Sequence, residues 1–309
     1  MNRALGLVAL SLFALTACVV EPGTGDEVSE ESDISPEIAG KAVLPVQGYA
    51  GGGSGGSTGI TYHGGPVMGN GVNMYYIWFG NFNGGSGSST SYKTILSDFG
   101  KAVGGSPYFG INTSYTDSTG ASVKNTVALG GEWTYAGSLA GKTRLTDANI
   151  KTIVTEAIAA GLGPAGGDVN GLYFVLTSKD VTASSGFCTQ YCGWHTHATI
   201  GGKDIKYSFV GDANRCISGC AAQTTSPNGD PGADGAVSVL AHELEEAASD
   251  PDLNAWYDSS GYENADKCAW TFGTQSTASN GSKYNMTLGS RQYLVQQNWS
   301  AASQSCALK

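Results

Sequence analysis

Residues 234–251 have the sequence DGAVSVLAHELEEAASDP. Asp234 is a good helix N-cap and Pro251 cannot continue a helix, so this stretch predicts a helix that ends at Asp250. With about 100° between successive residues, an apolar stripe lies opposite a polar stripe. The apolar stripe holds Val237, Leu240, Ala241, Leu244 and Ala248, and the polar stripe holds His242, Glu246 and Asp250 with Glu243 beside it.

The polar stripe is predicted to bind a metal ion. Residues four apart lie one turn apart on a helix, so the imidazole of His242 and the carboxylate of Glu246 can converge on one cation. This is the arrangement of the HExxH zinc helix, with glutamate in the second ligand position. Glu243 is then placed to accept a proton from a metal-bound water.

A catalytic zinc ion also needs a third protein ligand and an open position. Glu263 is the predicted third ligand, and Asp266 or Asp250 would orient His242 by a hydrogen bond. One imidazole with two carboxylates is a harder ligand set than usual, and calcium is an alternative to zinc. The acids that suit calcium are Asp250, Asp252, Asp258, Glu263 and Asp266. The same residues could instead hold a structural ion, or the acids could be solvated with no ion bound.

Two further histidines, His195 and His197, lie two residues apart. In a strand both side chains would point to the same face. We expect them to complete the metal site or to stabilise an oxyanion during catalysis. The alternative is that they are ordinary polar residues beside a disulfide.

Six cysteines follow residue 180, and they predict a disulfide framework in an exported chain. We expect two local pairs and a third pair between Cys268 and Cys306. A four-thiolate zinc site is the alternative suggested by the two C-x3-C spacings. The remaining cysteines are Cys188, Cys192, Cys216 and Cys220.

The N-terminus predicts export and anchoring. Residues 1–17 have the apolar run of a signal peptide, and Leu15-Thr16-Ala17-Cys18 resembles a bacterial lipobox that would lipidate Cys18. Residues 18–59 are predicted to be a flexible tether, because seven acids between Glu21 and Glu37 precede the glycine-rich stretch 51–56. The membrane would be contacted only through the lipid.

The composition predicts one folded domain over residues 60–309. Apolar residues make up 40 % of the 309-residue chain, enough for a core, and the formal net charge of −10 excludes a basic nucleic-acid binder. The apolar patterns predict an α+β fold with a central sheet, stabilised by disulfides. We expect strands at 72–79, 126–133, 172–177 and 206–210, helices at 92–103 and 146–160, and a hairpin over 284–296.

Several segments resemble the EXORDIUM, or phosphate-induced protein, family. They are residues 60–68 and 72–82, the stretch from Gly186 to His195, the stretch from Phe209 to Cys220, and the ending from Tyr293 to Cys306. The chain looks like a bacterial branch with a gluzincin-like HExxE helix. The resemblance implies a secreted or cell-surface protein, but it supplies no substrate.

The sequence thus favours an envelope-anchored or extracellular zinc-dependent hydrolase, in particular a metallopeptidase. Its substrate would be an extracellular peptide or a cell-wall polymer, and Glu243 would be the general base. The alternative is a non-catalytic module that binds cell-wall polymer through exposed tyrosine and tryptophan side chains, with a structural metal or none.

Overall fold

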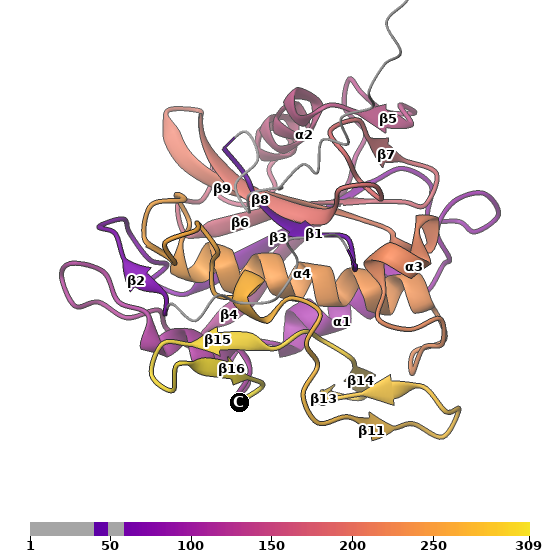
Figure 1. The fold of residues 1–309 in the computed structure, drawn as a ribbon. Helices are drawn as coiled ribbons and strands as arrows, with labels where there is room; N and C mark the ends of the chain where they lie inside the picture. Colours follow the sequence, from indigo (N-terminus) through magenta and orange to yellow (C-terminus); the bar gives the residue numbers. More distant parts are fainter. Residues whose placement is uncertain (1–39, 49–58) are drawn as a thin grey trace, which may run out of the picture. The chain divides into compact units, whose positions relative to one another are not determined.

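The computed structural model describes residues 40–48 and 59–309. Its centre is a six-stranded sheet with the strand order β1-β8-β9-β6-β3-β4 (Figure 1). β9, β6, β3 and β4 are parallel, whereas β8 is antiparallel to both of its neighbours. The strands are β1 (Ala42–Pro45), β3 (Val72–Phe79), β4 (Val127–Thr134), β6 (Gly171–Thr177), β8 (Tyr191–Ile200) and β9 (Lys203–Gly211). The predicted mixed α/β fold with a central sheet is confirmed.

The central strands are continuous apolar runs because helices cover both faces of the sheet. α2 (Asp147–Ala159) lies on one face, and α1 (Tyr92–Ala102) and α4 (Pro231–Ser249) lie on the other (Figure 1). Every residue of β6 is buried. Thr146 caps α2 as part of a capping box with Asn149, as its position before the apolar pattern indicates.

Shorter elements surround this core, and none of the described helices has the length and apolar character needed to cross a membrane. The predicted C-terminal hairpin is present as β13 (Met286–Leu288) paired with β14 (Arg291–Tyr293). The other short strands are β2 (Thr61–Tyr62), β5 (Arg144–Leu145), β7 (Thr182–Ala183), β10 (Trp256–Tyr257), β11 (Ser276–Thr277), β12 (Lys283–Tyr284), β15 (Asn298–Ser300) and β16 (Ser305–Ala307). The short helices are η1 (Phe109–Ser114), η2 (Ala213–Arg215), α3 (Ile217–Cys220) and η3 (Asp266–Cys268).

The helix that carries the HExxE motif begins earlier than predicted. Asp230 is the N-cap and accepts a hydrogen bond from the backbone N–H of Ala233, and Pro231 occupies the first turn, where its missing N–H costs nothing. Asp234 therefore lies inside the first turn, where its carboxylate accepts hydrogen bonds from Ser226 and Asn228.

α4 is also not amphipathic. Residues 232–249 are buried on every side, because the sheet covers one side while α1, η1 and β14 contact others. The predicted polar stripe therefore faces the protein interior. The helix approaches β8 closely at Gly193, where a side chain would collide with Val239.

The tether prediction is wrong for residues 42–45. These residues form β1, which pairs antiparallel with β8, and all four are buried. The apolar sequence AVLP, between the acidic and the glycine-rich stretches, is what allows this segment to join the sheet. The predicted signal peptide 1–17, Cys18 and most of the tether lie outside the described residues.

The predicted local cysteine pairs are wrong, whereas Cys268–Cys306 is confirmed. The hairpin of β8 and β9 aligns Gly193 with Val210, so the start of β8 lies beside the end of β9. This brings the two C-x3-C segments together, and they bond across to each other. The pairs are Cys188–Cys216 and Cys192–Cys220, so these cysteines are not zinc thiolates.

We predict that Gly193→Ala destabilises the protein by about 1–3 kcal/mol, the usual cost of overpacking a core. The added Cβ would lie 2.5 Å from Val239 Cγ1 and 3.0 Å from the Phe209 carbonyl oxygen. Urea unfolding measures the loss. Gly219→Ala is the control, since its Cβ would meet only Val46, at 3.5 Å. Equal losses for both variants would contradict the close approach of β8 and α4.

Candidate metal centre

α4 and η3 bring three potential ligands to one point. His242 Nε2 lies 2.8 Å from Glu246 Oε1 and 3.5 Å from Asp266 Oδ1. The three ligand atoms are all within 4.8 Å of one another, and the three residues are buried. The imidazole and carboxylate one turn apart on α4 thus converge with a third potential ligand, the carboxylate of Asp266, from the segment beyond the helix.

β8 contributes a second group of potential ligands beside the first. His195 Nε2 lies 2.9 Å from Glu263 Oε2 and 3.7 Å from Glu246 Oε2. His195, Glu243 and Glu246 also offer ligand atoms within 4.8 Å of one another. Glu246 is shared by the two groups, with one oxygen directed to each histidine. We call the six residues the buried cluster: His195, His242, Glu243, Glu246, Glu263 and Asp266.

The two downstream acids have different positions from those expected. Asp266, predicted to orient His242 from outside the ligand set, lies at the point shared by His242 and Glu246. Glu263, predicted as the third ligand, contacts His195 instead. Both acids are placed by the loop between β10 and η3, whose path the spacing along the chain does not determine.

The buried cluster contains polar atoms without hydrogen-bond partners. Glu243 is fully buried, and neither of its carboxylate oxygens has a partner with hydrogen-bond geometry in the described structure. Although His242 Nε2 is close to Glu246, that contact also lacks hydrogen-bond geometry. The unpartnered atoms are His195 Nδ1, His242 Nδ1 and Nε2, Glu243 Oε1 and Oε2, Glu246 Oε2, Glu263 Oε1 and Asp266 Oδ1. Such atoms are costly to bury unless a further group binds them.

The pKa values of the cluster residues are shifted because several acids are buried close together. Burial, and then repulsion from Glu246, raises the pKa of Glu243 and of Glu263 well above the ordinary value of a glutamate. Burial alone would lower the pKa of His242, but Glu246 and Asp266 together raise it well above its usual range. Burial lowers the pKa of His195 to about 4, so this imidazole is neutral near pH 7. A neutral imidazole is the form that binds metal ions.

The contacts around His242 are compatible with a zinc ion. Tetrahedral ligands about 2.0–2.1 Å from zinc lie roughly 3.3 Å from each other. The measured separations of 2.8 and 3.5 Å lie on either side of that value. The ligand atoms of Glu246 and Asp266 are within 4.8 Å of each other, so the three side chains lie close enough together to surround one ion.

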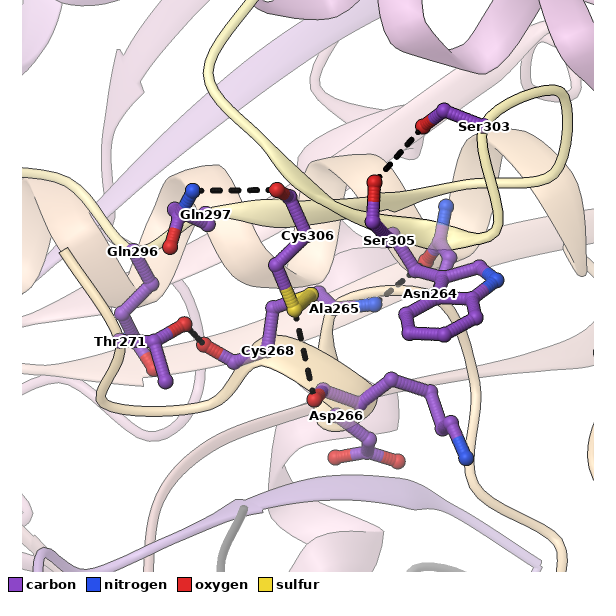
Figure 2. The surroundings of a disulfide bond; sticks show 12 residues. Asn264, Ala265, Asp266, Cys268, Thr271, Gln296, Gln297, Ser303, Ser305 and Cys306 are labelled. Atoms are coloured by element: carbon purple, nitrogen blue, oxygen red, sulfur yellow. Dashed lines mark hydrogen bonds between the residues drawn. A yellow bond between two sulfur atoms is a disulfide. The ribbon is translucent and has the colours of Figure 1, made fainter. Parts of the chain in front are cut away.

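The third disulfide holds Asp266 in place. Cys268 of η3 is bonded to Cys306 of β16, and Figure 2 shows this bond with Asp266 beside it. The Sγ atom of Cys306 also lies 3.6 Å from the carbonyl oxygen of Lys267. The sequence-based expectation that Cys268 fastens the acidic segment agrees with this arrangement.

Two other acids near the motif have structural partners. Asp250 is the C-cap of α4, and its carboxylate accepts hydrogen bonds from the backbone N–H groups of Asn254 and Ala255 at 2.6 and 2.7 Å. Glu245 accepts hydrogen bonds from the amides of Asn112 and Asn298. The sequence analysis missed these two asparagines, because they are distant in the chain and no local motif marks them.

His197, the second histidine of β8, lies outside the buried cluster. His197 Nδ1 lies 2.8 Å from Asp204 Oδ1 and 3.8 Å from Asp252, at a half-exposed position. Lys206 pairs with both of these acids. Asp258 pairs with Lys267 at 2.9 Å. The five acids proposed for calcium are therefore divided among a helix cap, two lysines and the buried cluster.

A small cavity leads toward the buried cluster. Its volume is about 90 Å³, and Asp250 and Glu263 line one part of it. Ala42 of β1 forms another part of the wall, together with Leu253, Tyr257 and Gly261. The cavity thus meets the buried cluster at Glu263, on the side where β1 lies.

The fold and the site define an α/β protein with three disulfides and a buried histidine–carboxylate cluster. Residues 60–309 match the model of the phosphate-induced protein 1 conserved region. The chain is 32 % identical to EXORDIUM-like 3 of Arabidopsis thaliana, over 80 % of this chain and 82 % of that protein. It is 30 % identical to EXORDIUM-like 5 of the same plant, over 80 % and 77 %. It is 27 % identical to PHOSPHATE-INDUCED 1 of Nicotiana tabacum, over 64 % and 67 %.

The chain therefore belongs to the EXORDIUM, or phosphate-induced protein, family. No solved structure shows significant similarity to it. The disulfides and the family membership indicate an extracellular or secreted protein.

We predict that the protein in excess chelator loses stability between pH 6.5 and 8. Carboxyl groups with raised folded-state pKa values keep protons that the unfolded chain has released, so stability falls as pH rises. His195, with a folded-state pKa of about 4, is partly protonated at pH 6.5 only in the unfolded chain, so it opposes the trend by no more than about 0.4 kcal/mol. One retained proton over 1.5 pH units corresponds to about 2 kcal/mol, or a Tm lower by roughly 4–8 °C.

Calorimetry in chelator at the two pH values measures this difference. Glu243→Gln removes one of the titrating carboxyl groups, so the variant should show a smaller drop in Tm. A Tm that rises with pH in the unsubstituted protein would contradict the raised pKa values.

Proposed function

We propose that this protein is an extracellular metal-binding module whose buried cluster holds one divalent cation, zinc in preference to calcium. The supporting observation is that His242 Nε2 and Asp266 Oδ1 have no hydrogen-bond partner and lie beside Glu246 Oε1, which accepts from the backbone N–H of Asp266, in fully or almost fully buried side chains. A cation would neutralise the acids and bind those atoms. Lipidation at Cys18 would anchor the module to the cell envelope.

The closed state of the buried cluster favours a structural ion as the primary role. His242, Glu243 and Glu246 are 0 % exposed, and Glu263 is 3 % exposed. A polymer chain has no direct access to side chains this deeply buried. None of the described tyrosine and tryptophan side chains is fully exposed either, which disfavours polymer binding on an open aromatic surface.

We predict about one zinc per chain in protein purified without chelator, and weaker binding by Glu246→Gln. The amide replaces the carboxylate shared by the two histidines, so we expect at least a tenfold loss of zinc affinity. Elemental analysis and competition with a chromogenic chelator measure both quantities. Glu245→Gln is the matched control, since Glu245 is equally buried but bound by asparagines. Equal affinity in the two variants would refute the assigned ligands.

A second candidate function is a zinc-dependent hydrolase, in particular a metallopeptidase acting on an extracellular peptide. Glu243 favours it, because both of its oxygens lack partners and it adjoins the ligand His242. A carboxylate with no competing hydrogen bond can take a proton from an attacking water and pass it to the leaving amine. Zinc would supply the lowered pKa of the water and polarise the carbonyl. Neutral His195, on the other side of Glu246, would stabilise the oxyanion.

The hydrolase candidate predicts that Glu243→Gln abolishes peptide cleavage and leaves the zinc content unchanged. A loss of about 100-fold or more is expected for a general base. Cleavage of a mixed peptide library, followed by mass spectrometry, measures it, with Glu245→Gln as the control. No cleavage by the zinc-loaded unsubstituted protein would reject this candidate and leave the metal-binding module.

A further inference from the structure

The edge of β8 is covered by a segment that is separated from the domain by glycine-rich sequence. β1 pairs antiparallel with β8, with Ala42 opposite His195 and Leu44 opposite Gly193 (Figure 1). The stretch 51–56, with the sequence GGGSGG, lies between β1 and the rest of the domain. Within the described residues, β1 is therefore joined along the chain to the rest of the domain only through this glycine-rich stretch.

β1 lies over the buried cluster. Because side chains alternate along paired strands, Ala42 and Leu44 share a sheet face with His195 and Gly193. That face is the one covered by α4, since a Cβ on Gly193 would lie 2.9 Å from Glu243 Oε1. Ala42 also forms the wall of the cavity that reaches Glu263. The two small or aliphatic side chains of β1 thus close the cluster on the side of β8.

The opposite face of the sheet binds a basic side chain at the start of β1. The ammonium group of Lys41 lies 2.6 Å from the Asp147 carboxylate of α2. The same group lies 4.9 Å from the centre of the Trp194 ring, within the range of a cation–π interaction. Lys41 is only 5 % exposed, which is rare for a lysine outside a built site.

Side chains of the domain hold the two ends of the segment. The hydroxyl of Thr196 donates to the carbonyl oxygen of Gly40 at 2.6 Å. At the other end, Trp270 Nε1 donates to the carbonyl oxygen of Pro45 at 3.0 Å. Because side chains at fixed positions make these bonds, they favour a strand of one direction and one register over any other.

We propose that the edge of β8 is a binding site for an extended peptide, and that residues 41–47 occupy it as an internal, displaceable ligand. The peptide that fits has a basic residue, then a small residue opposite His195, then two aliphatic residues, in antiparallel register. The inference deepens the proposed function, since it names the class of ligand that reaches the buried cluster. Until displaced, residues 41–47 keep the cluster closed.

Strand exchange is the physical basis of this site. Val43 and Leu44 are 0 % exposed, so the departure of β1 exposes two aliphatic side chains, and another strand that buries equivalent side chains offsets this cost. An incoming peptide can make the same backbone hydrogen bonds to β8, as in other cases of strand addition. The departing segment remains attached through the glycine-rich stretch and can return.

Hydrogen exchange on the unsubstituted full chain is the first test. Those amides of Ala42, Val43 and Leu44 that bond to β8 are expected to exchange at least tenfold faster than the amides of β6, through an opening that leaves the central strands protected. Equal exchange in β1 and β6 would show that β1 opens only when the whole domain unfolds, and would overturn the proposal.

A labelled peptide is the second test. The peptide KAVLPVQ, which copies residues 41–47, should bind full-length Val43→Asp at least tenfold more tightly than it binds the unsubstituted chain, where β1 occupies the site. A peptide with aspartate in place of its valine at the third position should bind at least tenfold more weakly. Val169→Asp makes the same substitution at a position that is 51 % exposed and is the control for added charge.

The remaining outcomes are also decisive. A folded Val43→Asp chain that does not bind the peptide would overturn the proposal. Loss of folding in Val43→Asp would do the same, because the domain would then depend on β1. Hydrogen exchange and peptide binding are both measured in chelator, and neither measurement depends on hydrolysis. Strand exchange without zinc binding would refute only the metal proposal, and zinc binding without strand exchange would refute only this one.

Discussion

The buried cluster is the constraint that shapes the surrounding structure. Four carboxyl groups and two imidazoles lie together in the interior, and several of their atoms have no hydrogen-bond partner. Unpaired carboxylates cannot stay ionised in such surroundings, so each must keep a proton or share a cation. The raised pKa values of Glu243 and Glu263 and the proposed zinc ion are two responses to the same excess of negative charge.

The scaffold holds this cluster by covalent and strand contacts from four parts of the chain. α4 supplies His242, Glu243 and Glu246, and β8 supplies His195. The disulfide to Cys306 fastens the loop that carries Asp266, while two disulfides join β8 and the residues just before it to the segment after β9. β1 closes the remaining side. The proposed metal binding and the proposed strand displacement would therefore act on the same elements.

Strand and helix positions were predictable because they depend on local patterns. The run VNMYYIWF is a strand buried on both faces, and the apolar spacing after Thr146 forms α2 with the predicted cap. The start of α4 was missed because Asp230 and Pro231 form a stronger cap than Asp234. β1 was missed because four apolar residues between an acidic and a glycine-rich stretch are too short for a periodic signal.

The shared direction of His242 and Glu246, one turn apart, follows from helix geometry and so could be read from the residues alone. The expected pairing of Cys268 with Cys306 is present, but it was reached by pairing the other four cysteines locally, which the structure contradicts. The meeting of Asp266 with His242 and of Glu263 with His195 became visible only in the folded chain, as did the cysteine pairs that join segments 28 residues apart. Those contacts depend on the β8–β9 hairpin and on the path of a loop, and neither is encoded by spacing along the chain.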